Sequence, residues 1–316
     1  MASENLALHR QALPLDDTLS ATRRRTVVVL SVLAGLAIAI LWSARLVDSD
    51  IGENIADNML GYNAKTTALT GGVAGAVFAF VAGIAGTFTA CNIAAFSAVG
   101  PMLGDASSGR ERIRRALPQV GWLALGIIVV AALYGAIGAA IGDRIPQLST
   151  HTVGNHVPVR LVQSILVFTV IGVLFGWLGL AALGTVPDPL RRLTNRWPQT
   201  PAVVMGALIG GFLVGRPYPL FFKLFQQAAH THNPFYGAAT FILTALGNVV
   251  IVAALFLALT VGTGGRYQRW LTARPGRLAT LTGAALIIGG AFMVFYWGVR
   301  LPARFDYGWF PAMPYR

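Results

Sequence analysis

Residues 83–104 read GIAGTFTACNIAAFSAVGPMLG, and this stretch holds the only cysteine of the chain, Cys91. It belongs to an apolar run that is too long and too rich in glycine for a plain membrane-spanning helix. Asn92 follows the cysteine, and Pro101 lies further along the same run. A thiol on a broken helix inside a bilayer would be a reactive group, but unpaired cysteine is also among the most buried residue types because of packing alone. The stretch therefore predicts a broken helix and leaves both interpretations of Cys91 open.

The composition of the whole chain indicates a polytopic membrane protein. Apolar residues make up 55% of the 316 residues, charged residues only 11%, and the mean hydropathy is +0.64. These values exclude a soluble globular domain. The net charge of +12 comes from arginines that cluster between apolar segments, as expected for membrane orientation and not for nucleic-acid binding. The lipid bilayer is the predicted partner. A single cysteine forms no intramolecular disulfide and so does not identify the redox compartment.

A spanning helix needs about 20 mainly apolar residues. Seven segments satisfy this requirement: 26–42, 68–99, 120–141, 161–183, 202–225, 238–261 and 278–299. The polar leader lacks a cleavage site after the first apolar run, so we expect the first span to remain as an anchor. The second segment is overlong, and we expect it to tilt or to break near residues 83–86 or 100–101, because glycine and proline interrupt a span only where protein or water satisfies the freed backbone groups.

The arginines also predict how the chain is oriented in the cell membrane. Clusters of arginine precede the first span and follow the second, fourth and sixth spans. The positive-inside rule therefore places the N-terminus in the cytoplasm, and seven spans then leave the C-terminus outside. The first outer loop is acidic and the outer tail is aromatic, which suits an external position; the residues are Asp48, Asp50, Glu53 and Asp57 in the loop and Trp309, Phe310 and Tyr315 in the tail.

An internal repeat is visible once the first span is set aside. The third span reads LGIIVVAALY from Leu125, and the sixth reads LGNVVIVAALF from Leu246, with one inserted residue. Two copies of three spans must have opposite orientations in the membrane, which is the inverted-repeat architecture. The predicted fold is thus an all-α membrane protein with seven transmembrane helices, one N-terminal span followed by an inverted 3+3 repeat. The predicted divisions are 1–67 (leader, first span and acidic outer loop), 68–184 and 185–300 (the two repeats) and 301–316 (outer tail).

The counterpart of the Cys91 region in the second copy is GGFLVGRPYPLFFKLF, at residues 210–225. Gly215, Pro217 and Pro219 are expected to break a helix, because each proline lacks a backbone donor and clashes with the preceding turn.

Arg216 lies at this predicted break, and two interpretations of it remain. A charge within a span is costly unless it faces protein or water. In the first interpretation Arg216 lines a cavity as a fixed positive charge, which would also stabilise a Cys91 thiolate if the two approach. In the second, the fifth span ends near Val214, and Arg216 and Lys223 lie at the outer interface.

Other polar residues give weaker indications. Four of the five histidines fall in predicted outer loops. Of these, His230 and His232 form a His-x-His pair that imidazole chemistry would allow to hold a transition metal, although loop histidines are commonly just solvated. Asn248 lies within an apolar stretch and is expected to bond to a neighbouring helix more readily than to a solute.

Catalytic signatures of soluble enzymes are absent from the sequence. There is no phosphate-binding loop, no pair of carboxylates within a span, and no histidine or aspartate within a span that would serve as a base for Cys91. The sequence therefore predicts no cofactor and no resident metal, and it leaves open whether the protein is an enzyme.

Several features recur together between residues 68 and 299: the three-plus-three arrangement, Cys91 with Pro101 downstream, Pro217 and Pro219 at the matching place in the second copy, and a closing ALIIGGAFMVF run. In these features the chain resembles the CcdA/DsbD transmembrane family, the thiol–disulfide transporters of cytochrome c biogenesis, which belong with the wider LysE-type exporters.

The resemblance implies a function with one departure. In that family one cysteine per repeat takes part in passing electrons from a cytoplasmic thioredoxin to extracytoplasmic thiol proteins. Cys91 matches the first cysteine, but Arg216-Pro217-Tyr218-Pro219 stands where the second is expected. A lone thiol forms only mixed disulfides or pairs with another chain.

Three functions therefore remain open. The first is thiol–disulfide exchange through Cys91 with a thioredoxin-like or cytochrome c maturation protein. The second is transport of a small solute or metal ion, without redox chemistry, around Arg216. The third is a non-transporting membrane scaffold.

Overall fold

The computed structural model describes residues 20–69, 72–87, 109–262, 276–311 and 313. Cys91, Asn92 and Pro101 lie outside these residues. The described part is almost entirely helical, apart from the two-residue antiparallel strands β1 (Thr152–Val153) and β2 (Val157–Pro158). The prediction of a helical fold is therefore confirmed.

The helices, with their bounds, are α2 (Ala21–Leu41), η1 (Arg45–Glu53), α3 (Asn54–Leu60), α4 (Gly72–Ala85), α6 (Gly109–Ile141), η3 (Gly142–Arg144), η4 (Pro146–Leu148), α7 (Val159–Ala182), α8 (Arg191–Arg196), α9 (Thr200–Gly215), α10 (Pro219–Thr231), α11 (Pro234–Gly262), α13 (Arg277–Met293), η5 (Val294–Arg300) and α14 (Leu301–Ala303).

The long helices match the predicted spans. In the described part of the chain, five segments are long and apolar enough to cross a membrane, those of α2, α6, α7, α11 and α13 with its continuation, and the bent pair α9–α10 makes a sixth if counted as one span. Helix α4 is shorter and ends at Ala85, within the region where a break was predicted. By length and composition these helices are suited to a membrane protein, whereas the count of seven spans stays a prediction.

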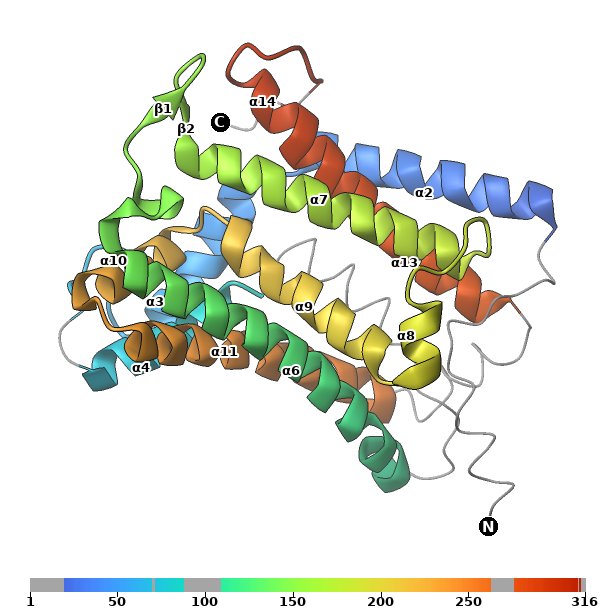
Figure 1. Cartoon of the computed structure of the whole chain (residues 1–316), viewed down its shortest axis with the longest axis horizontal. Helices are drawn as coiled ribbons and strands as arrows, with labels where there is room; N and C mark the ends of the chain where they lie inside the picture. The colour runs from blue at the N-terminus through green and yellow to red at the C-terminus, as the bar shows by residue number, and fades with distance from the viewer. Residues whose placement is uncertain (1–19, 70–71, 88–108, 263–275, 312, 314–316) are drawn as a thin grey trace.

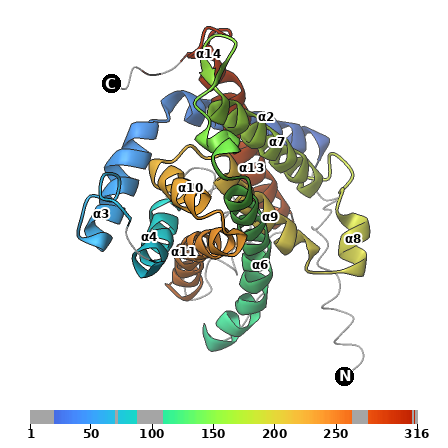
Figure 2. The same cartoon turned by 60° about the vertical axis from the view of Figure 1, so that its left-hand side comes forward.

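The long helices run along the long axis of the molecule in two layers (Figure 1). Helices α2, α7 and α13 form one layer, and α4, α6 and α11 form the other, with α9 between them; the turned view in Figure 2 shows the same grouping. Helix α6 packs against α9 and α11, α4 packs against α11, and α13 packs against α7 and α2. The site described below lies where the two layers meet.

Glycines allow the helices of the second layer to pack closely. A Cβ atom on Gly83 of α4 would be 2.0 Å from the carbonyl oxygen of Thr244 in α11, and one on Gly206 of α9 would be 2.0 Å from that of Leu123 in α6. A Cβ atom on Gly247 would likewise be 2.1 Å from the carbonyl oxygen of Phe80, and one on Gly126 would be 2.2 Å from that of Val203. Small residues of this kind are typical of helix–helix contacts in membranes.

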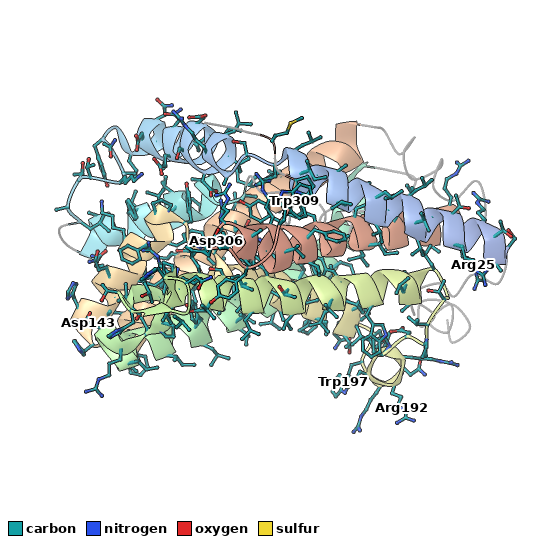
Figure 3. The ribbon with its side chains drawn as sticks, turned by 90° about the horizontal axis from the view of Figure 1, so that it is seen from above. Arg25, Asp143, Arg192, Trp197, Asp306 and Trp309 are labelled. Atoms are coloured by element: carbon teal, nitrogen blue, oxygen red, sulfur yellow. The ribbon has the colours of Figure 1, made fainter. Side chains whose placement is uncertain are left out.

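Charged residues gather at the ends of the bundle. Arg25 of α2 and Arg192 of α8 lie at one end together with Trp197, whereas Asp143 lies at the opposite end (Figure 3). Between these ends, α6 and α7 expose many apolar side chains, among them Leu133 and Leu166. An apolar belt between two polar ends is the surface that a bilayer requires.

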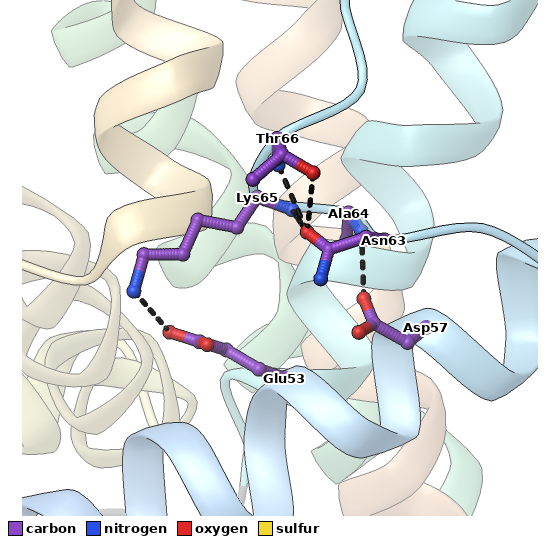
Figure 4. A network of polar contacts seen from close by, with 6 residues as sticks. All are labelled: Glu53, Asp57, Asn63, Ala64, Lys65 and Thr66. Atoms are coloured by element: carbon purple, nitrogen blue, oxygen red, sulfur yellow. Dashed lines mark hydrogen bonds and ion pairs between the residues drawn. The ribbon is translucent and has the colours of Figure 1, made fainter.

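The segment after α2, expected to be an acidic loop, is largely helical, with η1 and α3. The turn that follows α3 is held by side chains of its own (Figure 4). Asp57 Oδ1 accepts a hydrogen bond from the backbone of Ala64 at 2.6 Å, and Asn63 Oδ1 accepts one from the backbone of Thr66 at 3.0 Å. Lys65 Nζ lies 3.5 Å from Glu53 Oε1. These contacts fix the shape of the turn, and Lys223 of α10 attaches it to the bundle by donating to the carbonyl oxygen of Ala64 at 2.7 Å.

Candidate functional site

The helix break at Gly215 is the centre of the site. Helix α9 ends at Gly215, helix α10 starts at Pro219, and the two are bent by 82°. Pro217 and Pro219 have no backbone N–H, so an unbroken helix would lack donors at both positions and would clash with the preceding turn. The break predicted from the sequence is therefore present, and it leaves backbone carbonyls without helical partners.

Three side chains satisfy the freed carbonyls. Gln163 Nε2 donates to the carbonyl oxygen of Val214 at 2.7 Å, and the Tyr134 hydroxyl donates to the same oxygen at 3.3 Å. Gln147 Nε2 donates to the carbonyl oxygen of Arg216 at 3.3 Å. Non-helical backbone is tolerated at membrane depth where protein groups take over its hydrogen bonds. The surrounding helices thus hold the break in one fixed shape.

Arg216 points from the break into the protein, with only 8% of its surface exposed. Its Nη1 donates to the carbonyl oxygen of Gly86 at 2.6 Å, just beyond the C-terminus of α4. Its Nη2 forms an ion pair with Asp48. The guanidinium also lies over the ring of Tyr218, 4.5 Å from its centre. A cation near the C-terminus of a helix is favourable because the helix dipole is negative there.

Asp48 belongs to η1, in the segment that precedes the predicted repeats. Its side chain is 32% exposed, against 9% for that of Arg216, so the ion pair joins a half-open carboxylate to a buried guanidinium. A second contact supports this junction, because a Cβ on Gly52 would be 2.6 Å from the Tyr218 hydroxyl oxygen. The pair is therefore only partly buried, with Arg216 as its buried member and Asp48 as its solvent-accessible member.

A cavity of about 250 Å³ opens beside this ion pair. Its described lining is mostly aromatic and aliphatic, and its polar members are the ion pair, Thr244 and Asn248. Helices of both layers contribute. The lining residues are Trp42, Ala44, Asp48, Gly83, Gly86, Leu161, Phe168, Ile209, Phe212, Leu213, Arg216, Pro217, Phe221, Thr244, Asn248, Phe292, Tyr296, Trp297 and Leu301.

Stacked aromatic rings make up one wall of the cavity. The rings of Phe168 and Trp297 are parallel at 4.4 Å between centres, and Trp42 meets Phe292 edge to face at 5.3 Å. Aromatic pairs in these arrangements gain about 0.5–1.5 kcal/mol beyond the burial of their area. These rings consequently form a firm apolar part of the cavity lining.

The structure brings several sequence-predicted residues together here. Arg216, Pro217 and Asn248 line the cavity, and Gly215 and Pro219 flank the break beside it. Asn248 lines the cavity, and the expectation that it bonds to a neighbouring helix stays a prediction. The thiol chemistry expected of Cys91 stays a prediction, because that residue lies outside the described ones.

His230 and His232 lie at the end of α10 and just after it. In the parts of the chain that the structure describes, no three His, Cys, Asp or Glu side chains are grouped so that they would hold a metal ion. His232 Nδ1 instead lies 3.3 Å from the carbonyl oxygen of His230, and both side chains are exposed. The pair therefore lacks a third ligand of this kind among the described residues.

Sequence reasoning did not assign Asp48 and Gln163 to the site. Asp48 was interpreted as one of several loop acids, and nothing in its neighbours along the chain distinguishes it from Asp50. Gln163 lies near the start of a span, and its polarity inside an apolar helix was the available signal. Polar residues in spans commonly pair with one another or with backbone carbonyls.

Comparison of the chain with protein-family models, with curated proteins and with solved structures gives no match.

Proposed function

We propose that this protein is a membrane transporter that binds a small solute in the cavity at the α9–α10 break, with Arg216 as its fixed positive charge. One observation carries the proposal: Arg216 is buried at a break in an apolar helix and lines a cavity formed by helices of both layers. Ionisable residues inside membrane proteins are costly, and they mark solute and ion pathways. Broken helices near the middle of the membrane are the typical binding sites of secondary transporters.

Close glycine contacts support an inverted repeat as the scaffold. The alignment that pairs LGIIVVAALY with LGNVVIVAALF places Gly126 opposite Gly247 and Leu123 opposite Thr244. Gly83 of α4 corresponds to Gly206 of α9, and Phe80 of α4 corresponds to Val203 of α9. The difference in residue number is the same for both pairs.

With these correspondences, the two close glycine contacts between α4 and α11 match the two close glycine contacts between α9 and α6. Equivalent helices in the two copies thus make equivalent contacts. We propose seven spans, in which one repeat rocks against the other around the cavity.

The proposed orientation has the N-terminus in the cytoplasm of the cell and the C-terminus outside. Arg25 and Arg192 share one end of the bundle (Figure 3), as the positive-inside rule requires of a cytoplasmic end. The break at Arg216 and the segment that carries Asp48 then lie toward the outer half of the membrane.

The test is transport by the purified protein in liposomes. Radiolabelled organic anions, amino acids, sugars and divalent metals are offered in turn, with protein-free liposomes as the blank. We expect saturable uptake of one class, and its loss in Arg216→Ala at unchanged protein content. Lys65→Ala is the matched control, because Lys65 is an exposed cation away from the cavity lining. Equal uptake by Arg216→Ala and the wild type would contradict the proposal.

Thiol–disulfide exchange is the second candidate function. The observation that favours it is that Gly86 borders the cavity, and the chain continues from there toward Cys91. A thioredoxin-like or cytochrome c maturation protein would be the partner, and a mixed disulfide with Cys91 would be the intermediate.

A further inference from the structure

We infer that the ligand of this cavity is a small organic monocarboxylate with an aromatic or similarly apolar body, and that its carboxylate replaces Asp48 on Arg216. The inference rests on the proposed function only in taking this cavity as the binding site. It names the chemical class of the ligand and the residue that the ligand displaces.

The charge balance of the cavity carries the first step. Among the described lining residues, Arg216 supplies the positive charge and Asp48 the negative charge, so the described lining is neutral overall. An added anion would leave an uncompensated negative charge in a low-dielectric site, which is unfavourable. If Asp48 withdraws as the anion enters, the cavity stays neutral and the cost is avoided.

The exposure of the two partners shows which one leaves. Asp48 is 32% exposed, whereas the Arg216 side chain is 9% exposed and lies over Tyr218. The carboxylate therefore has water within reach, while the guanidinium is held by Gly86 and by aromatic rings. A surface-accessible carboxylate regains its hydration when it turns outward, so the exchange swaps one carboxylate for another on the same guanidinium.

The donors of Arg216 suit a carboxylate. A guanidinium carries five N–H groups in a planar fork and binds carboxylates in a bidentate manner. Among the described residues, Arg216 uses one N–H on Gly86 and one on Asp48. When Asp48 withdraws, the Nη2 group of Arg216 loses its acceptor. The other N–H groups of the guanidinium have no acceptor among the described residues, so an incoming carboxylate binds where Asp48 was bound.

The aromatic part of the cavity lining determines the body of the ligand. Phe168, Trp297, Trp42 and Phe292 present stacked and edge-to-face rings, and the volume of about 250 Å³ lies just below the range of about 300–1,000 Å³ that is typical of ligand pockets. Such a site accepts one ring or a short hydrocarbon chain. A benzoate-sized anion combines this body with the required carboxylate.

The experiment measures binding of radiolabelled benzoate to the purified full-length protein in lipid nanodiscs by equilibrium dialysis. We expect saturable binding by the wild type and at least tenfold weaker competition by benzamide, which has the same shape but no charge. Asp48→Asn should bind benzoate several-fold more tightly, because the internal competitor is gone. Asp50→Asn is the matched control on η1 and should bind as the wild type does.

Arg216→Gln should abolish saturable binding, and Arg216→Lys, which keeps the charge but not the fork, should weaken it at least tenfold. The lysine variant covers the case in which the glutamine variant does not fold. Equal competition by benzamide, weaker binding by Asp48→Asn, or no saturable binding of benzoate to the wild type would overturn the inference.

Failure of this inference is distinguishable from failure of the proposed function. Benzoate that binds as described but is not carried into liposomes leaves the inference standing and contradicts the transporter. Arg216-dependent uptake of a different class of solute, with no benzoate binding, supports the transporter and overturns the inference.

Discussion

Gly83 of α4 lies directly against the backbone of Thr244 in α11, since a Cβ atom on Gly83 would be 2.0 Å from the Thr244 carbonyl oxygen. In the equivalent place, a Cβ atom on Gly206 would be 2.0 Å from the Leu123 carbonyl oxygen. An added methyl group must therefore push the helices apart in either place. We expect Gly83→Ala and Gly206→Ala each to lower stability by about 1–3 kcal/mol, the usual cost of overpacking. The thermal unfolding midpoint in detergent measures this effect.

Gly121 of α6 and Gly176 of α7 serve as controls. A Cβ on Gly121 or Gly176 would meet nothing within 4 Å. Alanine at these helical positions is expected to leave the unfolding midpoint unchanged or to raise it, because glycine destabilises a helix interior by about 0.5–1 kcal/mol relative to alanine. An unfolding midpoint for Gly83→Ala that is unchanged or raised, as in these controls, would contradict the close contact with Thr244.

Gln163 is predicted to stabilise the helix break. Its Nε2 donates to the Val214 carbonyl oxygen at 2.7 Å and to the Tyr134 hydroxyl at 2.8 Å. Gln163→Leu removes both bonds and leaves the Val214 carbonyl oxygen with only the longer bond from Tyr134, and the loss of buried hydrogen bonds of this kind costs about 1–3 kcal/mol. We expect a lower unfolding midpoint, together with faster amide hydrogen exchange at the break. Gln226→Leu, at an exposed position of α10, should change neither. Unchanged exchange in Gln163→Leu would show that the break does not depend on this side chain.

Arg300 is predicted to fasten the end of α2 to the bundle. It is only 4% exposed, and its Nη1 donates to the carbonyl oxygens of Ala39 at 2.5 Å and Trp42 at 2.8 Å. Arg300→Met keeps much of the apolar volume but leaves these carbonyls without this donor. Hydrogen bonds to charged groups contribute about 1.5–3 kcal/mol. The expected result is a loss of that size in stability and faster proteolysis after α2, with a smaller loss in Arg300→Lys.

Apolar segments of the sequence predicted the helices well, because a spanning helix satisfies its own backbone and needs only length and hydropathy. The break at Gly215 was equally predictable, since Pro217 and Pro219 act locally through their rings. For these features the cause lies within a few residues along the chain.

The ion pair of Asp48 with Arg216 was not predictable in this way. Its members come from η1 and from the α9–α10 break, far apart in the chain, and the choice of Asp48 over Asp50 depends on how η1 packs against the break. For the same reason the sequence did not decide whether Arg216 lines a cavity or lies at the outer interface, because hydropathy does not indicate what a span packs against. The aromatic wall likewise depends on distant segments, such as those that carry Phe168 and Trp297.

The proposed orientation can be tested by labelling single cysteines in intact cells. Cys91→Ser gives a cysteine-free chain, because Cys91 is the only cysteine. We expect a cysteine at Lys65 to react with a membrane-impermeant maleimide added outside, and a cysteine at Arg192 to react only after the cells are opened. Both positions are exposed, so burial does not limit labelling. The reverse pattern would contradict the positive-inside assignment.

Cys91→Ser also separates the two candidate functions. The described lining of the proposed solute site includes no thiol, and serine is close to cysteine in size. If the protein moves a solute without redox chemistry, we expect Cys91→Ser to retain most of the wild-type uptake in liposomes, while Arg216→Ala loses it. In cells, the disulfide state of extracytoplasmic thiol proteins and the level of cytochrome c should then stay as in the wild type. A fall in cytochrome c in Cys91→Ser, with Arg216→Ala unaffected, would instead favour a mixed disulfide at Cys91 over a solute at Arg216, because only the thiolate attacks a partner disulfide.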